Sequence, residues 1–248
     1  MLEAASWAFI SREDTNFTYP VTDRCLKYLA HAVSTATGTT PEEAGSYIEE
    51  AQNDERLKSN VVEAIKNGPY RSYADPRCDF GRRLGWYAFA RILRPNIIVE
   101  TGVDKGFGSV LLCAALLRNG SGRFIGTDIN PNAGYLIQSP YSSVSTILYG
   151  DSIKSLRRLT HTIDLFINDS DHSANYELLE YQTIQGKLST KAIVLGDNAH
   201  ATTKLMEWSQ ETGRQFLFWR EEPVQHWYPG GGIGISFNLG ANSSDNRI

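Results

Sequence analysis

The sequence predicts an α/β protein: a Rossmann-like, doubly wound, mostly parallel sheet of seven strands, with a helical extension at the N-terminus. Three observations predict this fold. Residues 97–238 alternate between short apolar runs and helical segments, which is typical of strand–helix–strand units. The first run, Ile97-Ile98-Val99, is apolar without alternation, as in a strand that is buried on both faces. Residues 1–80 carry little strand signal but contain several helix starts.

Length and composition limit the possible functions. A chain of 248 residues with 41% hydrophobic residues is long enough for one large domain, or for one domain with an extension. The net charge of −4 does not favour nucleic acid as a partner. The apolar run 110–117 is too short to span a bilayer, and we see no secretory signal at the start of the sequence. Three scattered cysteines without a C-x-x-C pair fit reduced thiols, so we expect a cytoplasmic protein.

The predicted domain organisation is a helical extension, residues 1–80, followed by a sheet domain, residues 81–248. The predicted helices lie at 24–37, after Thr40-Pro41, after Asn53 or Asp54, and at 81–93. A sheet of this kind closes its core without such a prefix. We therefore expect residues 1–80 to act as a substrate lid or as a dimerisation element rather than as a plain buttress.

A glycine-spaced loop joins the first strand to the next helix, in the pattern E-x-G-x-x-x-G-x-S. Glycines let the backbone approach a ligand closely, and the start of the helix adds free N–H groups. The spacing matches neither the dinucleotide fingerprint nor a P-loop, which disfavours NAD. The residues that we expect to contact a cofactor here are Glu100, Thr101, Gly102, Gly106, Gly108 and Ser109.

Acidic residues also follow the second and third strands, which are predicted at 123–128 and 145–149. Asp128 ends its strand about 20 residues after the glycine loop, where an acid accepts hydrogen bonds from ribose hydroxyls. Asn130-Pro131 follows, so a turn or cap aspartate is the alternative. Asp151, next to Ser152, contacts an adenine amino group or caps the following helix, and the two roles can coexist.

The densest polar cluster follows strands four and five, predicted at 163–167 and 191–195. These strands are neighbours in a doubly wound sheet, so the side chains at their carboxyl ends converge. Carboxylate and amide oxygens suit Mg²⁺ or Mn²⁺, and no Cys/His set indicates zinc. We therefore expect Asp169, Asp197 and Asn198 to hold such an ion, with Asp171 as an alternative to Asp169. The alternative is that these residues are helix caps and exposed turn acids.

The last predicted strands, 215–221 and 232–238, form a hairpin that gives the sheet one antiparallel strand. The aromatic residues of the loop between them, including Trp227 and Tyr228, either line a substrate pocket or pack at a subunit contact.

Taken in order, these segments resemble class I S-adenosylmethionine (SAM) methyltransferases. Among these, the region 97–238 is most similar to the metal-dependent O-methyltransferases of the macrocin/mycinamicin sugar type, with features of the catechol type. The sugar type has a histidine three residues after the first metal aspartate, as His172 follows Asp169, whereas Asp197-Asn198 resembles the catechol type. The matching segments are V-E-T-G-V-D-K-G-F-G-S, G-T-D at Asp128, G-D at Asp151, D-S-D-H at 169–172 and G-D-N at 196–198.

This resemblance implies that SAM lies along the glycine loop, with its ribose on Asp128, and that Asp169 takes part in cofactor binding and catalysis. It also implies that Mg²⁺ binds a substrate hydroxyl and lowers its pKa, and that His172 removes the proton. The implied reaction is methyl transfer to a hydroxyl of a small molecule, a sugar or another natural product. We expect a cytoplasmic homo-oligomer without nucleic-acid or membrane partners.

Other interpretations are open at this stage. One keeps SAM but omits the metal, with His172 alone as the base. Another is a cephalosporin hydroxylase-like relative, which shares the D-x-D-H region, although no spacing here indicates an iron-binding triad. A third is a SAM-binding or dimerisation module without turnover, against which the intact set of Asp169, His172 and Asp197 argues.

Overall fold

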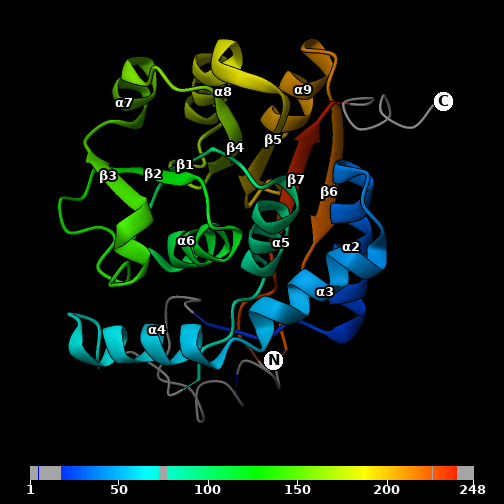
Figure 1. The fold of residues 1–248 in the computed structure, drawn as a ribbon. Coiled ribbons are helices and arrows are strands. Elements are labelled where there is room, and N and C mark those ends of the chain that lie inside the picture. Colours follow the sequence, from blue (N-terminus) through cyan, green and yellow to red (C-terminus); the bar gives the residue numbers. More distant parts are fainter. Residues whose placement is uncertain (1–4, 6–17, 73–76, 225, 239–248) are drawn as a thin grey trace.

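The computed structural model describes residues 5, 18–72, 77–224 and 226–238. Its centre is a seven-stranded sheet in the order β3-β2-β1-β4-β5-β7-β6 (Figure 1). The strands are β1 (Ile97–Thr101), β2 (Arg123–Asp128), β3 (Ser145–Tyr149), β4 (Ile163–Asn168), β5 (Leu188–Asp197), β6 (Gln215–Arg220) and β7 (Gly232–Phe237).

The sheet is mixed. Strands β3, β2, β1, β4 and β5 pair in parallel, and β7 runs antiparallel to both β5 and β6. The predicted hairpin and the predicted neighbourhood of β4 and β5 are both confirmed. Because the strand order reverses between β1 and β4, a crevice opens at the carboxyl ends of these two strands, where ligands of such sheets bind.

Helices cover both faces of the sheet (Figure 1). Helices α7, α8 and α9 lie on one face, and α5 and α6, joined by α2 and α3, lie on the other. The helices are α2 (Asp23–Thr37), α3 (Pro41–Gln52), α4 (Glu55–Asn67), α5 (Arg83–Leu93), α6 (Phe107–Asn119), α7 (Ser152–Arg158), α8 (Ala174–Ile184) and α9 (Lys204–Glu211), with short 3-10 turns η1 (Tyr141–Val144) and η2 (Gln185–Lys187).

Side-chain caps begin the N-terminal helices where the sequence predicts them. Thr40 accepts a hydrogen bond from the Glu43 backbone N–H at 3.1 Å, ahead of a proline at the first position of α3. Asp54, rather than Asn53, caps α4 by accepting from the Leu57 N–H at 2.9 Å. Helix α9 begins later than the predicted 199, because residues 198–201 form a turn first, closed by the Ala201 N–H on the Asn198 carbonyl at 2.8 Å.

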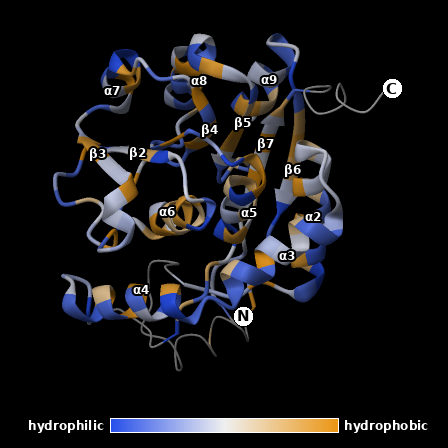
Figure 2. Cartoon of the chain, in the orientation of Figure 1, coloured by the Kyte–Doolittle hydropathy of each residue, from blue (hydrophilic) through white to orange (hydrophobic). Residues whose placement is uncertain are grey.

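The apolar core lies on both sides of the sheet. The smaller cluster lies under α7–α9, and the larger one joins α2–α6 to the sheet. Helix α6 is buried almost all round and is mostly orange in Figure 2. Leu29, Val33, Ile48 and Leu57 belong to the larger cluster, so α2, α3 and α4 share a core with the sheet. The domain boundary at residue 80 stays a prediction, as does a lid or dimerisation role for the extension. Parts of the extension lie outside the described residues.

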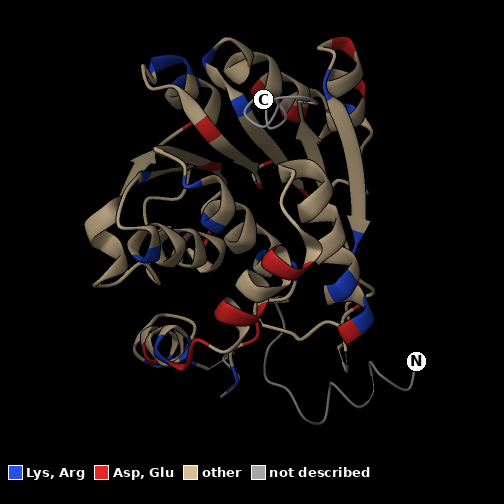
Figure 3. Ribbon diagram, turned by 45° about the vertical axis from the view of Figure 1, so that its right-hand side comes forward, with Lys and Arg blue, Asp and Glu red and all other residues tan. Residues whose placement is uncertain are grey.

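In the described part of the chain, no helix is both long and apolar enough to cross a bilayer. The outlying helix α4 carries acidic and basic residues together (Figure 3).

Candidate active site

Two adjoining cavities open at the carboxyl ends of the parallel strands. The first, here called the aspartate cavity, measures about 450 Å³; it is lined by Thr127, Asp128, Ile129, Gly150, Asp151, Ser152, Ser170, Asp171 and Tyr176. The second, called the arginine cavity, measures about 340 Å³; it is lined by Arg82, Arg83, Glu100, Val103, Lys105, Phe107, Gly108, Asn198 and Tyr228. Gly102, Asp104 and Asp169 line both, so one elongated ligand can occupy the two cavities together.

Two glycines after β1, one in the loop and one at the start of α6, leave no room for a side chain. Gly102 has a φ of 82°, and a Cβ there would lie 1.9 Å from the backbone oxygen of Asp169. The loop after β1 therefore packs directly on the loop after β4. A Cβ on Gly108 would lie 2.2 Å from the ring of Trp86. Gly106 begins α6 and packs against Gly134, away from the cavity that Gly102 and Gly108 line.

Three other predicted cofactor residues are buried. Glu100 lines the arginine cavity and accepts a hydrogen bond from the Ser109 hydroxyl at 2.5 Å; burial raises the pKa of Glu100 to about 8. Thr101 donates its hydroxyl to Glu180 at 2.9 Å. Thr101 and Ser109 are 0% exposed and line neither cavity, so their predicted cofactor contacts stay predictions.

Asp128 is a turn aspartate that also lines a cavity, and its contact with a ribose stays a prediction. Its carboxylate accepts hydrogen bonds from the backbone N–H groups of Asp104 and Asn130, both at 2.7 Å, and it also lines the aspartate cavity. Asp151 likewise caps α7 through the Lys154 N–H at 2.8 Å and lines the same cavity. Each aspartate shapes its own turn and still faces the space in which a ligand would lie.

Glu180, which no sequence motif singled out, joins the loops around the aspartate cavity. This residue of α8 is 0% exposed and accepts hydrogen bonds from Thr101 and Ser170, both at 2.9 Å, and from Ser152 and Asn168. Burial raises its pKa, although these hydrogen bonds oppose the shift. The one signal in the sequence is an acid within the largely apolar stretch L-L-E-Y.

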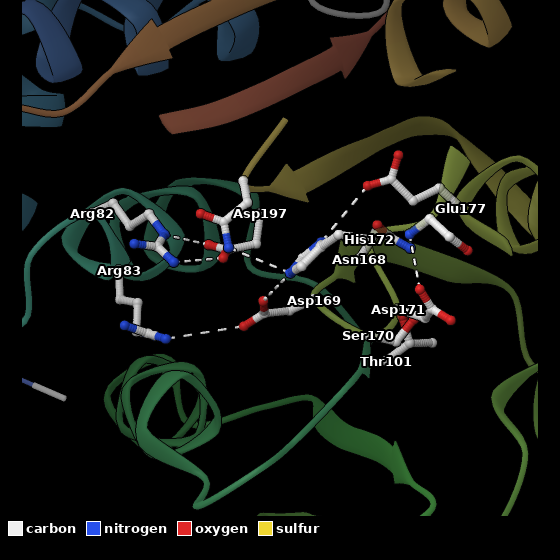
Figure 4. Close-up of polar contacts among 12 residues, drawn as sticks. Arg82, Arg83, Thr101, Asn168, Asp169, Ser170, Asp171, His172, Glu177 and Asp197 are labelled. Carbon is white, nitrogen blue, oxygen red and sulfur yellow. Dashed lines mark hydrogen bonds and ion pairs between the residues drawn. The ribbon is translucent and has the colours of Figure 1, made fainter. Parts of the chain in front are cut away.

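Arg82, which likewise no sequence motif singled out, is the centre of a buried ionic network. Its Nε and Nη2 lie 2.5 and 2.6 Å from the two carboxylate oxygens of Asp197 (Figure 4). Its Nη1 donates to Glu221 at 2.9 Å and to the Tyr19 hydroxyl at 2.6 Å. Asp197 and Glu221 are 0% exposed and Arg82 is 5% exposed. The two consecutive arginines before an apolar helix are the only local signal for this network.

The predicted base lies beside the predicted metal ligands (Figure 4). Nε2 of His172 is 3.7 Å from Oδ1 of Asp169 and 3.3 Å from Nδ2 of Asn198. Nη2 of Arg83 lies 4.0 Å from Oδ2 of Asp169. Asp171 instead accepts a hydrogen bond from the Ser173 N–H at 2.8 Å, at the start of α8, which makes it a turn residue.

The two aspartates of this cluster have pKa values shifted in opposite directions. Burial, together with the neighbouring charge of Asp197, raises the pKa of Asp169 well above its usual value. Burial acts on Asp197 too, but Arg82 outweighs it and holds the pKa of Asp197 below its usual value. The nearby Glu177 carboxylate raises the pKa of His172, and partial burial opposes this shift. Asp197 is therefore the carboxylate that carries the charge.

The predicted metal site is gathered only in part. Asp169, His172 and Asp197 each offer one ligand atom, and these atoms lie within 4.8 Å of one another. Both oxygens of Asp197, however, accept hydrogen bonds from Arg82. The Oδ1 of Asn198 accepts from the Tyr228 hydroxyl at 3.1 Å. Two of the three predicted ligands are therefore already engaged, which opposes binding of a divalent ion in this arrangement, and the metal stays a prediction.

Known proteins resemble this chain in sequence and in fold. Residues 99–199 match a family model described as a methyltransferase domain. A methyltransferase from Geobacter sulfurreducens is 20% identical, with a TM-score of 0.53 over 72% of this chain and 89% of its own. The O-methyltransferase TomG from Streptomyces achromogenes, involved in tomaymycin synthesis and solved with SAM, is 15% identical, with a TM-score of 0.55 over 76% of this chain and 91% of its own.

An O-methyltransferase from Bacillus cereus, solved with S-adenosylhomocysteine (SAH), is 13% identical, with a TM-score of 0.54 over 73% of this chain and 90% of its own. No curated protein matches the sequence. The match places a methyltransferase-domain segment in the chain, and the solved structures share its fold. The finer resemblance to the sugar type stays a prediction.

Proposed function

We propose that this protein transfers a methyl group from SAM to a hydroxyl of a small molecule. The observation that carries the proposal is the pair of adjoining cavities, which share Gly102, Asp104 and Asp169. The aspartate cavity offers groups that suit a nucleoside. The arginine cavity is lined by Asp169, which forms a cluster with His172 and Asp197. A cofactor with an adenosine at one end and an amino acid at the other fits this order.

The linings of the two cavities suit the two ends of SAM. Asp128 suits the ribose hydroxyls, because a carboxylate at a strand end accepts hydrogen bonds from them. Ile129, which is 81% exposed at the same cavity, offers an apolar surface to an adenine ring. In the arginine cavity, Arg83 Nε is buried and has no hydrogen-bond partner in the described part of the chain, so it suits the carboxylate of the amino-acid end.

His172 is the proposed base. Its Nδ1 lies 3.7 Å from Oε1 of Glu177, so this side of the ring suits the N–H, and Nε2 is left as the acceptor. Nε2 lies beside Asp169 and Asn198, which both line the arginine cavity. A substrate hydroxyl there would lose its proton to Nε2; bound SAM would supply the methyl group, with its C–S bond breaking as the C–O bond forms, and would leave as SAH.

SAM binding is the test of this function, with Gly102→Ala as the variant. Calorimetry should detect binding of SAM and SAH to the wild type. Gly102→Ala should abolish it, because the new Cβ would lie 1.9 Å from the Asp169 backbone oxygen at a φ of 82°. Gly186→Ala is the matched control, since its Cβ meets nothing within 4 Å. Tight binding of NAD without any binding of SAM would contradict the proposal.

A metal-dependent form of the same reaction is the second candidate. The gathering of Asp169, His172 and Asp197 favours it, and the engagement of Asp197 by Arg82 opposes it. Turnover in the presence of excess chelator separates the two forms. A sugar or other natural product as the acceptor, and assembly into a homo-oligomer, are parts of the proposal that product analysis and light scattering would test.

A further inference from the structure

We propose that Arg82 occupies the place of a divalent ion in this site: its guanidinium holds Asp197, and methyl transfer proceeds without metal. The part of the inference that concerns methyl transfer rests on the proposed function. The part that concerns the pairing of Arg82 with Asp197 does not. Whether a cation other than Arg82 can bind Asp197 is a property of the folded protein and can be measured without substrate.

The geometry of the pair supports this assignment. A guanidinium presents its N–H groups in a rigid planar fork that matches the two oxygens of a carboxylate. Arg82 uses Nε and Nη2 in this way, at 2.5 and 2.6 Å from Oδ1 and Oδ2 of Asp197. A metal would need at least one of these oxygens in direct coordination.

Burial makes the pair a permanent part of the fold. Arg82 is 5% exposed and its two carboxylate partners, Asp197 and Glu221, are 0% exposed. The Tyr19 hydroxyl accepts from Arg82 at 2.6 Å and donates to Glu221 at 2.8 Å, so the third contact of the guanidinium is fixed as well. A cation could displace Arg82 only by leaving a buried guanidinium with unpaired N–H groups.

The surrounding charge also disfavours a metal. Arg83, the next residue, reaches Asp169 at 4.0 Å. An ion between Asp169 and Asp197 would therefore lie beside two guanidinium groups. Repulsion between charges at such distances is strong where water is largely excluded.

A turn directs the two arginines to the two acids. The Arg83 backbone N–H donates to the Phe80 carbonyl at 3.1 Å, and Gly81 within this turn has a φ of 53°. The turn lies before the matched region 99–199, so the likeness to the methyltransferase-domain family does not extend to Arg82.

The deciding measurement is binding of Mn²⁺ to the folded protein, by electron paramagnetic resonance or calorimetry, without SAM or substrate. The wild type should bind no stoichiometric Mn²⁺ at millimolar concentrations. Arg82→Gln frees both oxygens of Asp197 and should bind Mn²⁺ at least about tenfold more tightly than the wild type, and the added change Asp197→Asn should abolish this gain. Arg82→Lys, which keeps a positive charge, should exclude Mn²⁺ as the wild type does.

Two outcomes overturn the proposal: a wild-type Mn²⁺ site that Asp197→Asn removes, or a folded Arg82→Gln protein that binds no Mn²⁺. If Arg82→Gln does not fold, the wild type and Arg82→Lys still decide, because Mn²⁺ bound through Asp197 in either one contradicts the assignment. Wild-type turnover should also continue in excess EDTA. Failure to bind SAM would instead refute the proposed function and leave the Mn²⁺ result intact.

Discussion

The two sides of the candidate site differ in the charge of the buried residue at their centre. Around the aspartate cavity, one buried acid, Glu180, gathers four hydroxyl and amide donors. Around the arginine cavity, one buried cation, Arg82, gathers two carboxylates and a phenol. The donors to Glu180 are uncharged, so the loss of one donor removes one hydrogen bond and leaves the other three in place. Two of the partners of Arg82 are carboxylates, so losing either side of these ion pairs leaves a buried charge without compensation.

The partners of these two central residues also differ in their positions along the sequence. The partners of Glu180 lie between residues 101 and 170, within the region that matches the methyltransferase-domain model. Arg82 instead joins Tyr19, Asp197 and Glu221, of which only Asp197 lies in that region. In terms of the proposed function, we call the side around Glu180 the cofactor side and the side around Arg82, next to the proposed base His172, the acceptor side.

The largest expected effect is chemical and belongs to the acceptor side. His172→Ala should lower the rate of the chemical step by about 10²–10⁴-fold, the usual contribution of a positioned acid–base group. SAM affinity should hardly change, because His172 is assigned to no cofactor contact. Single-turnover kinetics and SAM calorimetry measure the two effects. Near-wild-type turnover would move the base elsewhere, with Asp171 as the next candidate.

The pH profile is the control for that assignment. Since the base must be neutral and Glu177 raises the pKa of His172, the wild-type rate should fall, as pH is lowered, at a higher pH than an ordinary histidine would give. Glu177→Gln removes this carboxylate and should move the acid limb to lower pH. An unmoved limb in Glu177→Gln would contradict the pairing.

The next effect is on stability. Arg82→Ala leaves Asp197 and Glu221 buried without their cation and should lower the free energy of unfolding by about 3–5 kcal/mol. Arg24→Ala is the matched control, because its ion pair with Glu222 at 2.7 Å is exposed, and it should leave the melting temperature nearly unchanged. Equal losses from the two variants in denaturant titration would show that burial does not distinguish these pairs.

The smallest effect belongs to the cofactor side. Glu180→Gln keeps the size of the side chain but turns one acceptor oxygen into a donor, so part of its hydrogen bonds are lost, at about 1–3 kcal/mol for the buried groups left unpaired. SAM affinity should fall while the single-turnover rate at saturating SAM stays close to wild type. A loss of rate without a loss of affinity would remove the distinction between the two sides.

The sequence was sufficient for the sheet, because apolar runs mark strands and the strand order then follows from simple rules. The predicted strands 123–128 and 145–149 coincide with β2 and β3. Convergence of Asp169 and Asp197 was also predictable, since β4 and β5 are parallel neighbours. These inferences need only the backbone.

Side-chain direction and distant partners were beyond the sequence. Glu100 and Thr101 are consecutive in one strand, so they point to opposite faces; a motif does not say which of them faces the ligand. Arg82 is paired with a residue 115 positions away, and no local pattern identifies such a partner. The predicted metal depended on Asp197 being unengaged, which only the packing of the turn before α5 could decide.

The contact between Tyr19 and Glu221 bridges 202 positions of the chain, and Arg82 lies between them. Closing such long loops costs chain entropy before any contact compensates for it, so we expect contacts of this kind to form late in folding. The bonds of Glu180 to Ser152, Asn168 and Ser170 close loops of only 28, 12 and 10 positions. During refolding, the chain should therefore regain its capacity to bind SAM before it regains turnover, and recovery of activity would report that the segments around Tyr19 and Glu221 have met.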